Sequence, residues 1–544
     1  MSQLRPFATP AQSAPIAGGA ALNSYDRLPS EPRPLPATLP DTLAVTAALA
    51  GLSTAPVTAC RVLEIGCAVG GNLLPMAQAL PGSTFVGIDL SARQIAAAQR
   101  TATGAGIQNV RLEVKDFTTL TAEDGPFDYI IAHGIYGCVA PAARDQLLPV
   151  ISRLLAPDGV AYVNYYVYPG WHTREMFREI VLANAQIDSD PRAAAADVRR
   201  ALQMMADQSP TNAENLYAAH LRQETAFLHA VPDEYLIHEY LEANPTAIYF
   251  QQFVQQLAEC GLGYAAEIKP NPSRRRLANE LMTRQPDLAQ DWMKLEQYID
   301  FVQGAFVRRS LLCRAGRQVF QFPRPEVIER LILRALALPA VTQGDVRSNE
   351  PIPFRVSDGK TVDISDPLVK TTLAALARGW PRALSFEEML AVIRSDLQFG
   401  GQFALPGSQE REAILHTALN LYGLNMVDLH EHAAVFVPVA SEKPKATALA
   451  RYQARESKMV ASLHHALVTT LSKTDRLVLA HLNGARDRGA LMAVLRTAIG
   501  KGILPDPAKD PEAAAEAGLQ GPLENVLEQS LGKLANEGFL IEQP

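Results

Sequence analysis

The chain has 544 residues, a formal net charge of −7, 48% hydrophobic residues and 20% charged residues, which is the composition of an ordinary globular protein. At roughly 100–200 residues per domain, this length predicts about three domains. The sequence excludes several classes: no apolar run reaches the roughly 18 residues of a membrane-spanning helix, the acidic balance disfavours a general nucleic-acid binder, and five scattered cysteines without a C-x-x-C pair indicate a reducing compartment and no zinc.

The first 24 residues are rich in Pro, Ala, Gly and Ser and are predicted to be an unstructured leader. They contain no apolar core segment, so we do not expect a secretory signal. Tyr25 is a candidate lid residue over a pocket, and a surface tyrosine in a tail is the alternative. A proline-rich stretch over 29–40 follows, and Asp41 is predicted to cap a helix over 42–52. Leu43, Ala47, Ala48 and Leu52 are predicted to form one apolar face of this helix.

A strand, a glycine turn and a helix over 61–80 form the stretch around which we expect the chain to be organised. Such a unit brings backbone close to a nucleotide in a Rossmann-type fold, because glycine has no Cβ to block the turn or the ligand. The turn holds Gly66, Gly70 and Gly71 but lacks the second glycine of the dinucleotide fingerprint G-x-G-x-x-G. Its pattern E-x-G-x-x-x-G, beginning at Glu64, resembles motif I of class I S-adenosylmethionine-dependent methyltransferases.

The next two strands end on side chains suited to a nucleoside. The strand over 84–89 ends on Asp89, at the distance from the glycine turn expected of a ribose-binding carboxylate. Ser91 is predicted to cap the helix that follows. The strand over 110–114 runs into Asp116 and Phe117, which suit the exocyclic amine and the ring of an adenine. Taken alone, Asp116 is equally suited to cap a turn.

The fourth and fifth strands are predicted over 127–131 and 160–165. The carboxyl end of the fourth strand borders the switch point of a doubly wound sheet, where ligands bind, so we expect His133 and Tyr136 near the reacting centre. An aromatic loop, 166–172, follows the fifth strand. Further predicted elements are a helix over 142–155, a helical insertion over about 173–245, a helix over 249–258, and strands over 261–268 and 308–313 that close the sheet near 316.

Two further units follow the sheet. Residues 317–440 contain a predicted hairpin around Asp358-Gly359, and helices are predicted over 366–378, 385–397 and 410–423. Residues 441–544 contain predicted helices over 474–483, 487–498 and 523–536, a Pro/Asp/Ala linker over 504–517 and a short strand at 538–541, an order typical of a winged helix. The last helix carries Glu524, Glu528 and Glu537 against one Lys533, so we expect it to contact protein rather than nucleic acid.

Four segments carry a closer resemblance: CRVLEIGCAVGGNLLPMA (60–77), FVGIDLSARQI (85–95), FDYIIAHGIYG (127–137) and GVAYVNYYVYPGWH (159–172). They resemble class I methyltransferases that carry an appended methyltransferase regulatory domain, a group that includes the rickettsial protein lysine methyltransferases of outer-membrane protein B. The similarity extends more weakly to 488. It implies an α/β fold with a Rossmann-like methyltransferase domain and helical insertion over 1–316, a mixed α/β middle domain over 317–440 and a winged-helix-like domain over 441–544.

The resemblance also implies the site. We expect S-adenosyl-L-methionine as cofactor, no metal, and a cytoplasmic bacterial enzyme acting on a protein or peptide, with a homodimer as one arrangement. The expected cofactor-binding residues are Tyr25, Glu64, Gly66, Cys67, Ala68, Gly70, Asn72, Asp89, Leu90, Gln94, Asp116, Phe117, His133 and Gly134. The residues expected around the reacting centre, as catalytic candidates, are His133, Tyr136, Tyr165, Tyr168, Trp171 and His172.

Lysine methylation requires a neutral amine, and the free pKa of lysine is about 10.4. Aromatic walls would lower that pKa and hold the ammonium group, and His133 or His172 would take the proton. Gly137-Cys138-Val139-Ala140 replaces the family's usual Ser-Trp-Val-Pro, and Ser30 stands where a tyrosine is usual, so the acceptor is open. A small-molecule N- or O-methyltransferase and a non-catalytic protein that senses the cofactor are the alternatives.

Overall fold

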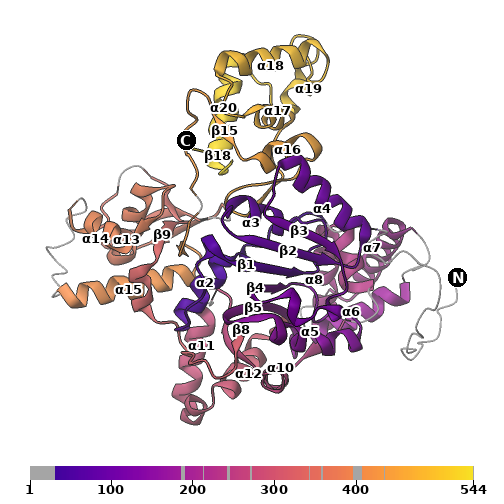
Figure 1. Ribbon diagram of the computed structural model, residues 1–544, viewed down its shortest axis with the longest axis vertical. Coiled ribbons are helices and arrows are strands. Elements are labelled where there is room, and N and C mark those ends of the chain that lie inside the picture. The colour runs from indigo at the N-terminus through magenta and orange to yellow at the C-terminus, as the bar shows by residue number, and fades with distance from the viewer. Residues whose placement is uncertain are drawn as a thin grey trace.

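The computed structural model describes residue 28 and residues 31–184, 190–211, 214–241, 245–269, 272–341, 344–356, 359–395, 407–433 and 435–542. Its centre is a sheet with strand order β3-β2-β1-β4-β5-β8-β7, in which β6 pairs with β5 (Figure 1). The sheet is parallel from β3 to β5, and β8 runs antiparallel to both β5 and β7. The predicted α/β, Rossmann-like fold is confirmed. The strands are β1 Arg61–Ile65, β2 Thr84–Asp89, β3 Val110–Val114, β4 Phe127–Ala132, β5 Leu155–Val167, β6 Ala247–Ile248, β7 Leu262–Glu267 and β8 Val307–Arg314.

Alternate residues of the central strands enter two cores, one on each face of the sheet. Val62 and Tyr129 pack on one face, with α2 Pro40–Leu49, α3 Leu73–Ala79 and α4 Ala92–Ala105. Leu63 and Ile130 pack on the other face, with α5 Pro141–Leu154 and α10 Phe250–Glu259. Because both faces are covered, the strands are nearly continuous apolar runs, and their carboxyl ends are left for a ligand.

Helix starts follow the sequence in one case and depart from it in another. The Ser91 hydroxyl accepts a hydrogen bond from the Gln94 amide, so its predicted cap on α4 is confirmed. The predicted Asp41 cap is wrong. The helix α2 begins at Pro40, so Asp41 lies in its first turn. The Asp41 carboxylate does not cap the helix. It accepts hydrogen bonds from the Nδ1 of His430 at 2.7 Å and from the amides of Glu431 and His432 at 2.8 Å each.

The helical insertion between β5 and β6 is confirmed and has a small core of its own. It contains α6 Gly170–Asn184, α7 Pro191–Gln208, α8 Leu216–Ala230, α9 Asp233–Leu236 and a π-helical turn, Ile237–Leu241. A second helical pair, α11 Pro272–Arg284 and α12 Trp292–Gln303, lies between β7 and β8 and was not predicted. Arg308 of β8 holds this pair through Asp300 and Glu296, at 2.9 and 2.8 Å.

A separate core lies beyond β8 and contains Val45 and Leu49 of α2. The helix α2 is therefore buried on two sides, between the sheet and this unit, whereas the sequence predicted one apolar face. The predicted hairpin is confirmed as β11 Ile352–Arg355 and β12 Thr361–Ile364, although Asp358 itself lies outside the described residues. The other elements are β9 Ile332–Ala335, β10 Leu338–Pro339, β13 Leu384–Ser385, β14 Val427–His430, α13 Pro367–Gly379, α14 Phe386–Ser395 and α15 Gly407–Gly423.

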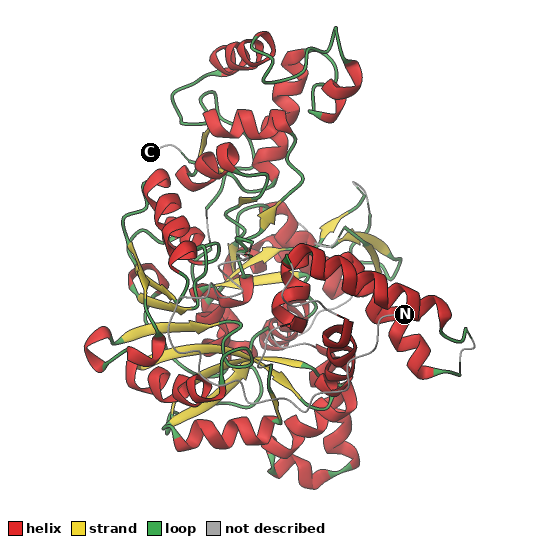
Figure 2. Ribbon diagram, turned by 90° about the vertical axis from the view of Figure 1, so that its right-hand side faces the viewer, coloured by secondary structure: helices red, strands yellow, loops and turns green. Residues whose placement is uncertain are grey.

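The C-terminal unit forms a mostly helical lobe at one end of the molecule (Figures 1 and 2). It contains α16 Ala448–Glu456, α17 Lys473–His481, α18 Arg488–Gly500, α19 Pro511–Glu516, α20 Leu523–Asn536 and the short pairs β15 Lys445–Ala446 with β18 Leu540–Ile541 and β16 Val460–Ala461 with β17 Leu467–Val468. The predicted linker over 504–517 is a partial error, because α19 forms there behind the Asp510 cap.

The separate cores support domain boundaries near 316 and 440, which we keep as a proposal. Within the part of the chain described, no helix has the length and apolar character needed to cross a bilayer.

Candidate cofactor and active site

The glycine turn between β1 and α3 is tied to the end of β2. The amides of Gly66 and Cys67 donate to the Ile88 carbonyl at 2.8 and 3.0 Å. Gly66 has a φ of +75°, and a Cβ there would lie 2.4 Å from the Cδ1 of Ile135. Only glycine fits this position, because a side chain would be strained and would collide with the loop after β4.

A cavity of about 430 Å³ opens over this turn at the carboxyl ends of β1, β2 and β4. The N-terminal segment and the helical insertion provide its other walls. The predicted cofactor residues that line it are Glu64, Gly66, Cys67, Ala68, Asn72, Asp89, Leu90, Gln94, Phe117, His133 and Gly134. Their roles stay predictions, but the fold brings all of them to one cavity.

Glu64 presents an unpaired oxygen to this site. Its side chain is buried, and Oε1 accepts a hydrogen bond of 2.6 Å from the Nδ2 of Asn72, whereas the buried Oε2 has no partner. Burial raises the pKa of Glu64 to about 7. A buried carboxylate oxygen without a partner is costly, and an ammonium group would satisfy it. The methionine end of S-adenosylmethionine carries such a group, so the residues fit this cofactor.

Asp89 is fixed at the end of β2. One carboxylate oxygen accepts from the Ala68 amide at 2.9 Å, and the other accepts from the Ser91 amide at 2.8 Å. Each carboxylate oxygen can accept a second hydrogen bond, so the pair can also receive the two hydroxyls of a ribose. The same contacts join the glycine turn to the strand end that carries Asp89.

Two of the described predicted cofactor residues, Asp116 and Gly70, do not line the cavity. The Asp116 carboxylate accepts from the Thr118 amide at 2.9 Å and caps a short 3-10 helix, which is the alternative the sequence left open. The Gly70 amide donates to the Cys67 carbonyl at 2.9 Å, so Gly70 shapes the turn instead of lining it. Tyr25, like Ser30, lies outside the described residues.

Of the catalytic candidates, His133 alone lines the cavity. Its Nδ1 lies 3.0 Å from the Tyr162 hydroxyl, and burial lowers the pKa of His133 to about 4. The imidazole is therefore neutral at physiological pH and weakly basic, which disfavours the predicted role as proton acceptor.

The other catalytic candidates pack behind the cavity. Tyr165 is buried, stacks on Phe253 at 3.8 Å and lies 3.1 Å from the Ser310 hydroxyl, and Tyr136 meets the same Phe253 edge-on. Trp171 is buried and stacks on Tyr166 at 3.7 Å. Tyr168 and His172 stack at 4.1 Å, and both hydrogen-bond Glu175. Tyr136, Tyr165 and Trp171 are thus packed in the core, as large apolar rings usually are, whereas Tyr168 is half-buried and His172 is exposed.

Sequence reasoning missed the walls that long-range packing supplies. The N-terminal segment contributes Glu31, Arg33 and Leu35, and the insertion contributes Pro232, Glu234, Tyr235, His238 and Glu239. No motif marks these residues, because their position depends on how the insertion folds back over the strand ends. Lys115, Ile135 and Cys138 also line the cavity and directly follow predicted strands, a signal that could have found them.

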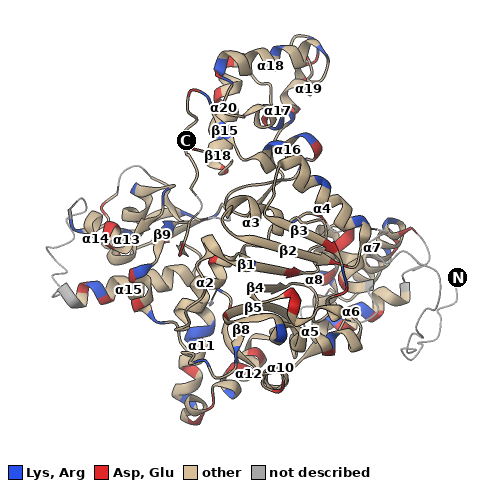
Figure 3. Cartoon of the chain, in the orientation of Figure 1, with Lys and Arg blue, Asp and Glu red and all other residues tan. Residues whose placement is uncertain are grey.

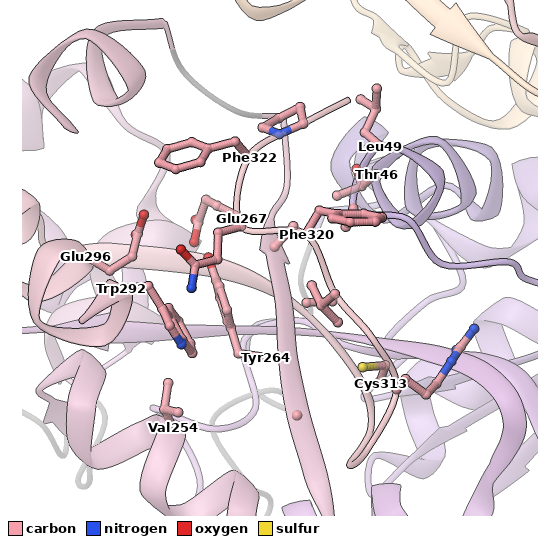
Figure 4. Close-up of a pocket in the computed structure, with 18 of the residues that line it drawn as sticks. Thr46, Leu49, Val254, Tyr264, Glu267, Trp292, Glu296, Cys313, Phe320 and Phe322 are labelled. Atoms are coloured by element: carbon pink, nitrogen blue, oxygen red, sulfur yellow. The ribbon is translucent and has the colours of Figure 1, made fainter. Parts of the chain in front are cut away.

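A second cavity of about 430 Å³ lies away from the glycine turn, beside β7, the end of β8, α2 and α15 (Figure 4). Trp292 stacks on Tyr264 at 5.6 Å in its wall, and the exposed rings of Phe320 and Phe322 face it. The described residues that line it include none of the predicted site residues. The chemistry expected from the sequence therefore belongs to the first cavity.

Comparisons with known proteins agree with this fold. Family models match a methyltransferase domain over 62–159, a predicted methyltransferase regulatory domain over 232–314 and the PKMT C-terminal winged helix domain over 442–539. The uncharacterized protein RP789 of Rickettsia prowazekii (strain Madrid E) is 26% identical over 528 residues, which cover 95% of this chain and 94% of that protein. The uncharacterized protein RP028 of the same organism is 35% identical over 233 residues, 43% of this chain and 93% of that protein.

The solved structure of PKMT2 from Rickettsia typhi superposes with a TM-score of 0.78 at 24% identity, over 94% of this chain and 100% of that one. Its complex with AdoHcy gives the same TM-score at 23% identity and the same coverage. Fold and site together define a class I S-adenosylmethionine-dependent methyltransferase. Within that class, the chain belongs to the family that carries a methyltransferase regulatory domain and a C-terminal winged helix. The predicted enzyme class and cofactor are confirmed.

Proposed function

We propose that this methyltransferase acts on lysine side chains of a protein or peptide in the bacterial cytoplasm. The observation that carries the proposal is the match of residues 442–539 to the winged helix domain described for PKMT proteins. The full-length similarity of fold to rickettsial PKMT2 adds to it. A helical lobe placed beside the cofactor domain would give a large substrate more surface than a small metabolite needs.

When bound, the cofactor supplies an electrophilic methyl group on a sulfonium. The residues of this chain would hold and orient it: Glu64 at the ammonium end, Asp89 at the ribose and Phe117 at the adenine. Methyl transfer needs alignment of acceptor, methyl and sulfur and exclusion of water, more than covalent help. The insertion residues that wall the cavity would exclude that water.

A small-molecule acceptor is a second candidate, and one observation favours it. Pro232 and Tyr235 of the insertion, with Arg33 of the N-terminal segment, line the same cavity as the glycine turn. A cavity walled by an insertion suits a compact acceptor, whereas a long groove would suit a peptide.

Contacts on the winged helix support a protein partner over nucleic acid. Glu528 and Glu524 of α20 pair with Arg488 at 2.7 Å and Arg496 at 3.6 Å, so basic groups of this module are partly neutralised. Acidic and basic residues are interspersed on its helices in Figure 3. We propose that this module contacts protein, either the substrate or a second copy of the chain.

The test uses purified protein, methyl-labelled cofactor and a size-fractionated host extract. Label in the macromolecular fraction, recovered as methyl-lysine after hydrolysis, supports the proposal, and label only in small molecules supports the second candidate. Asp89→Ala is the control, since it should abolish labelling by preventing cofactor binding. No transfer by a wild-type protein that binds the cofactor would contradict both.

A further inference from the structure

Glu239 faces the cavity from the π-helical turn Ile237–Leu241 at the end of the insertion. His133, Gly134 and Cys138, from the loop that follows β4 at the switch point of the sheet, line the same cavity. A π-helical turn is rare and frequently occurs at functional sites. Glu239 is thus a carboxylate that lines the same cavity as the predicted cofactor residues.

The aromatic loop after β5 positions this carboxylate. The Tyr166 hydroxyl donates a short hydrogen bond to the Oε2 of Glu239, and the Sγ of Cys138 lies 3.7 Å from the same hydroxyl. The ring of Tyr166 is fixed by its stack on Trp171, 3.7 Å between centroids and 17° between planes. Trp171, which was expected at the reacting centre, therefore holds the ring of Tyr166, and Tyr166 in turn positions Glu239.

Burial makes the carboxylate of Glu239 a better proton acceptor than an exposed glutamate. Burial raises the pKa of Glu239 above its usual value, and the charges of Arg174 and His238 oppose that rise. Tyr166, Cys138 and Tyr235 are further titratable groups near it, and Glu234 and His133 line the same cavity. Arg174 is itself engaged, since its Nη1 donates to the Tyr235 hydroxyl at 2.9 Å and its guanidinium lies over Phe306 at 4.6 Å. An incoming ammonium group would offset the desolvation of this partly buried carboxylate.

We propose that Glu239 binds the ammonium group of the acceptor lysine and takes its proton before methyl transfer. This inference rests on the lysine acceptor proposed above. One N–H bond of the ammonium breaks and its proton goes to the carboxylate, which leaves a lone pair on nitrogen. The lone pair forms the N–C bond while the S–C bond breaks and its electrons stay on sulfur. Glu239 then returns the proton to solvent, so each turnover releases one proton.

The decisive variant is Glu239→Gln, assayed for methyl-lysine with poly-L-lysine and with the host macromolecular fraction. General-base catalysis contributes about 10²–10⁴-fold, so we expect a loss of at least about 100-fold at pH 7 with unchanged cofactor affinity. The free lysine pKa is about 10.4, so raising the pH by two units supplies about 100-fold more neutral amine and should restore most of the rate. Glu214→Gln, an exposed carboxylate of the same insertion, is the matched control and should behave as wild type.

Tyr166→Phe keeps the stacked ring and removes the hydrogen bond, so it should show the same pH-dependent loss with a smaller amplitude. Glu239→Asp should recover part of the activity at pH 7. A Glu239→Gln rate that is unchanged, or lowered equally at every pH with lost cofactor affinity, would overturn the inference while the lysine acceptor stands. Absence of methyl-lysine with wild-type protein would instead remove the proposed function and this inference with it.

Discussion

At the scale of single residues, Glu64 couples protonation of the cofactor cavity to stability. Its pKa is about 7 in the folded protein against an ordinary value of 4.5. The folded state therefore binds a proton more tightly, and the free energy of unfolding falls as pH rises from about 4.5 through 7, by about 3 kcal/mol in total. Glu64→Gln removes this contribution. We expect the difference between the melting temperatures at pH 5 and pH 8, without cofactor, to be smaller in the variant.

Cofactor serves as the control for this prediction, because an ammonium group beside the ionised carboxylate offsets its desolvation. Saturating cofactor should raise the melting temperature at pH 8 more in wild type than in Glu64→Gln. Identical pH slopes for the two proteins would show that Glu64 does not titrate in this range.

The sequence predicts a site residue when strand order alone places it, and it fails when the direction of the side chain decides. Glu64 and Asp89 lie within or at the end of parallel strands, so strand order alone brings them to one cavity. Tyr165 and Trp171 were expected at the reacting centre from the family resemblance, but strand parity turns Tyr165 into the core with Phe253. Its neighbour Tyr166 points the other way and reaches Glu239. A one-residue change of parity moves a side chain to the opposite face, and the sequence of an all-apolar strand does not record it.

At the scale of elements, the N-terminal segment depends on the size of Gly71. A Cβ at Gly71 would lie 2.3 Å from the Cα of Pro32. The same segment carries Arg33 and Leu35 into the cavity, and the Leu35 amide donates to the Oδ1 of Asn72 at 2.8 Å. Gly71→Ala should displace the segment and weaken cofactor binding about tenfold, the equivalent of about 1.4 kcal/mol. Calorimetric titration measures the affinity directly.

The matched control is Gly532→Ala in α20, where an added Cβ meets nothing within 4 Å. It should leave affinity unchanged and slightly raise helix stability, since alanine is the better helix former. Unchanged affinity in Gly71→Ala would mean that the segment is not needed over the turn.

Among elements, those that are amphipathic or apolar with clear ends were predictable, and those defined by tertiary partners were not. The strands β1 to β4 and α20 match the sequence pattern closely, whereas β5 Leu155–Val167 is longer than the predicted 160–165. The helix α2 was assigned one face, because the pattern does not reveal that a second unit covers Val45 and Leu49. The pair α11 and α12 was missed although it shares a small apolar core that includes Ala278 and Leu295. Its attachment to the sheet through Arg308, Asp300 and Glu296 is a tertiary contact that no local pattern records.

At the scale of the whole molecule, Asp41 anchors the middle unit on the cofactor domain. Its carboxylate accepts hydrogen bonds from His430 and from the amides of Glu431 and His432. Removing a buried carboxylate from such donors costs about 3 kcal/mol. Asp41→Ala should therefore speed proteolysis between 317 and 440 while the cofactor domain keeps its affinity. Asp41→Asn, which retains an acceptor oxygen, should lose less.

A hydrogen bond joins the C-terminal module to the cofactor cavity. The Nε2 of His465 lies 2.8 Å from the Oδ1 of Asn72, and the Nδ2 of Asn72 donates to Glu64 at 2.6 Å. Burial lowers the pKa of His465 to about 3, so the ring is neutral and donates through Nε2. The module thereby orients the Asn72 amide, and Asn72 orients the Glu64 carboxylate, which is expected to bind the cofactor's ammonium group.

His465→Ala should weaken cofactor binding about fivefold to tenfold, because a lost hydrogen bond is worth about 1 kcal/mol and the Asn72 amide regains freedom to rotate. Coupling between two sites is reciprocal, so cofactor should in turn slow hydrogen exchange in the turn between β16 and β17 of the wild type. His481, whose Nδ1 bonds the Leu477 carbonyl inside the module at 2.8 Å, provides the control variant His481→Ala. If His465→Ala binds cofactor as wild type does and the exchange of 462–466 ignores the cofactor, the module is attached to the site without acting on it. The expected loss would instead mean that any protein docking on the winged helix can change cofactor affinity through Asn72.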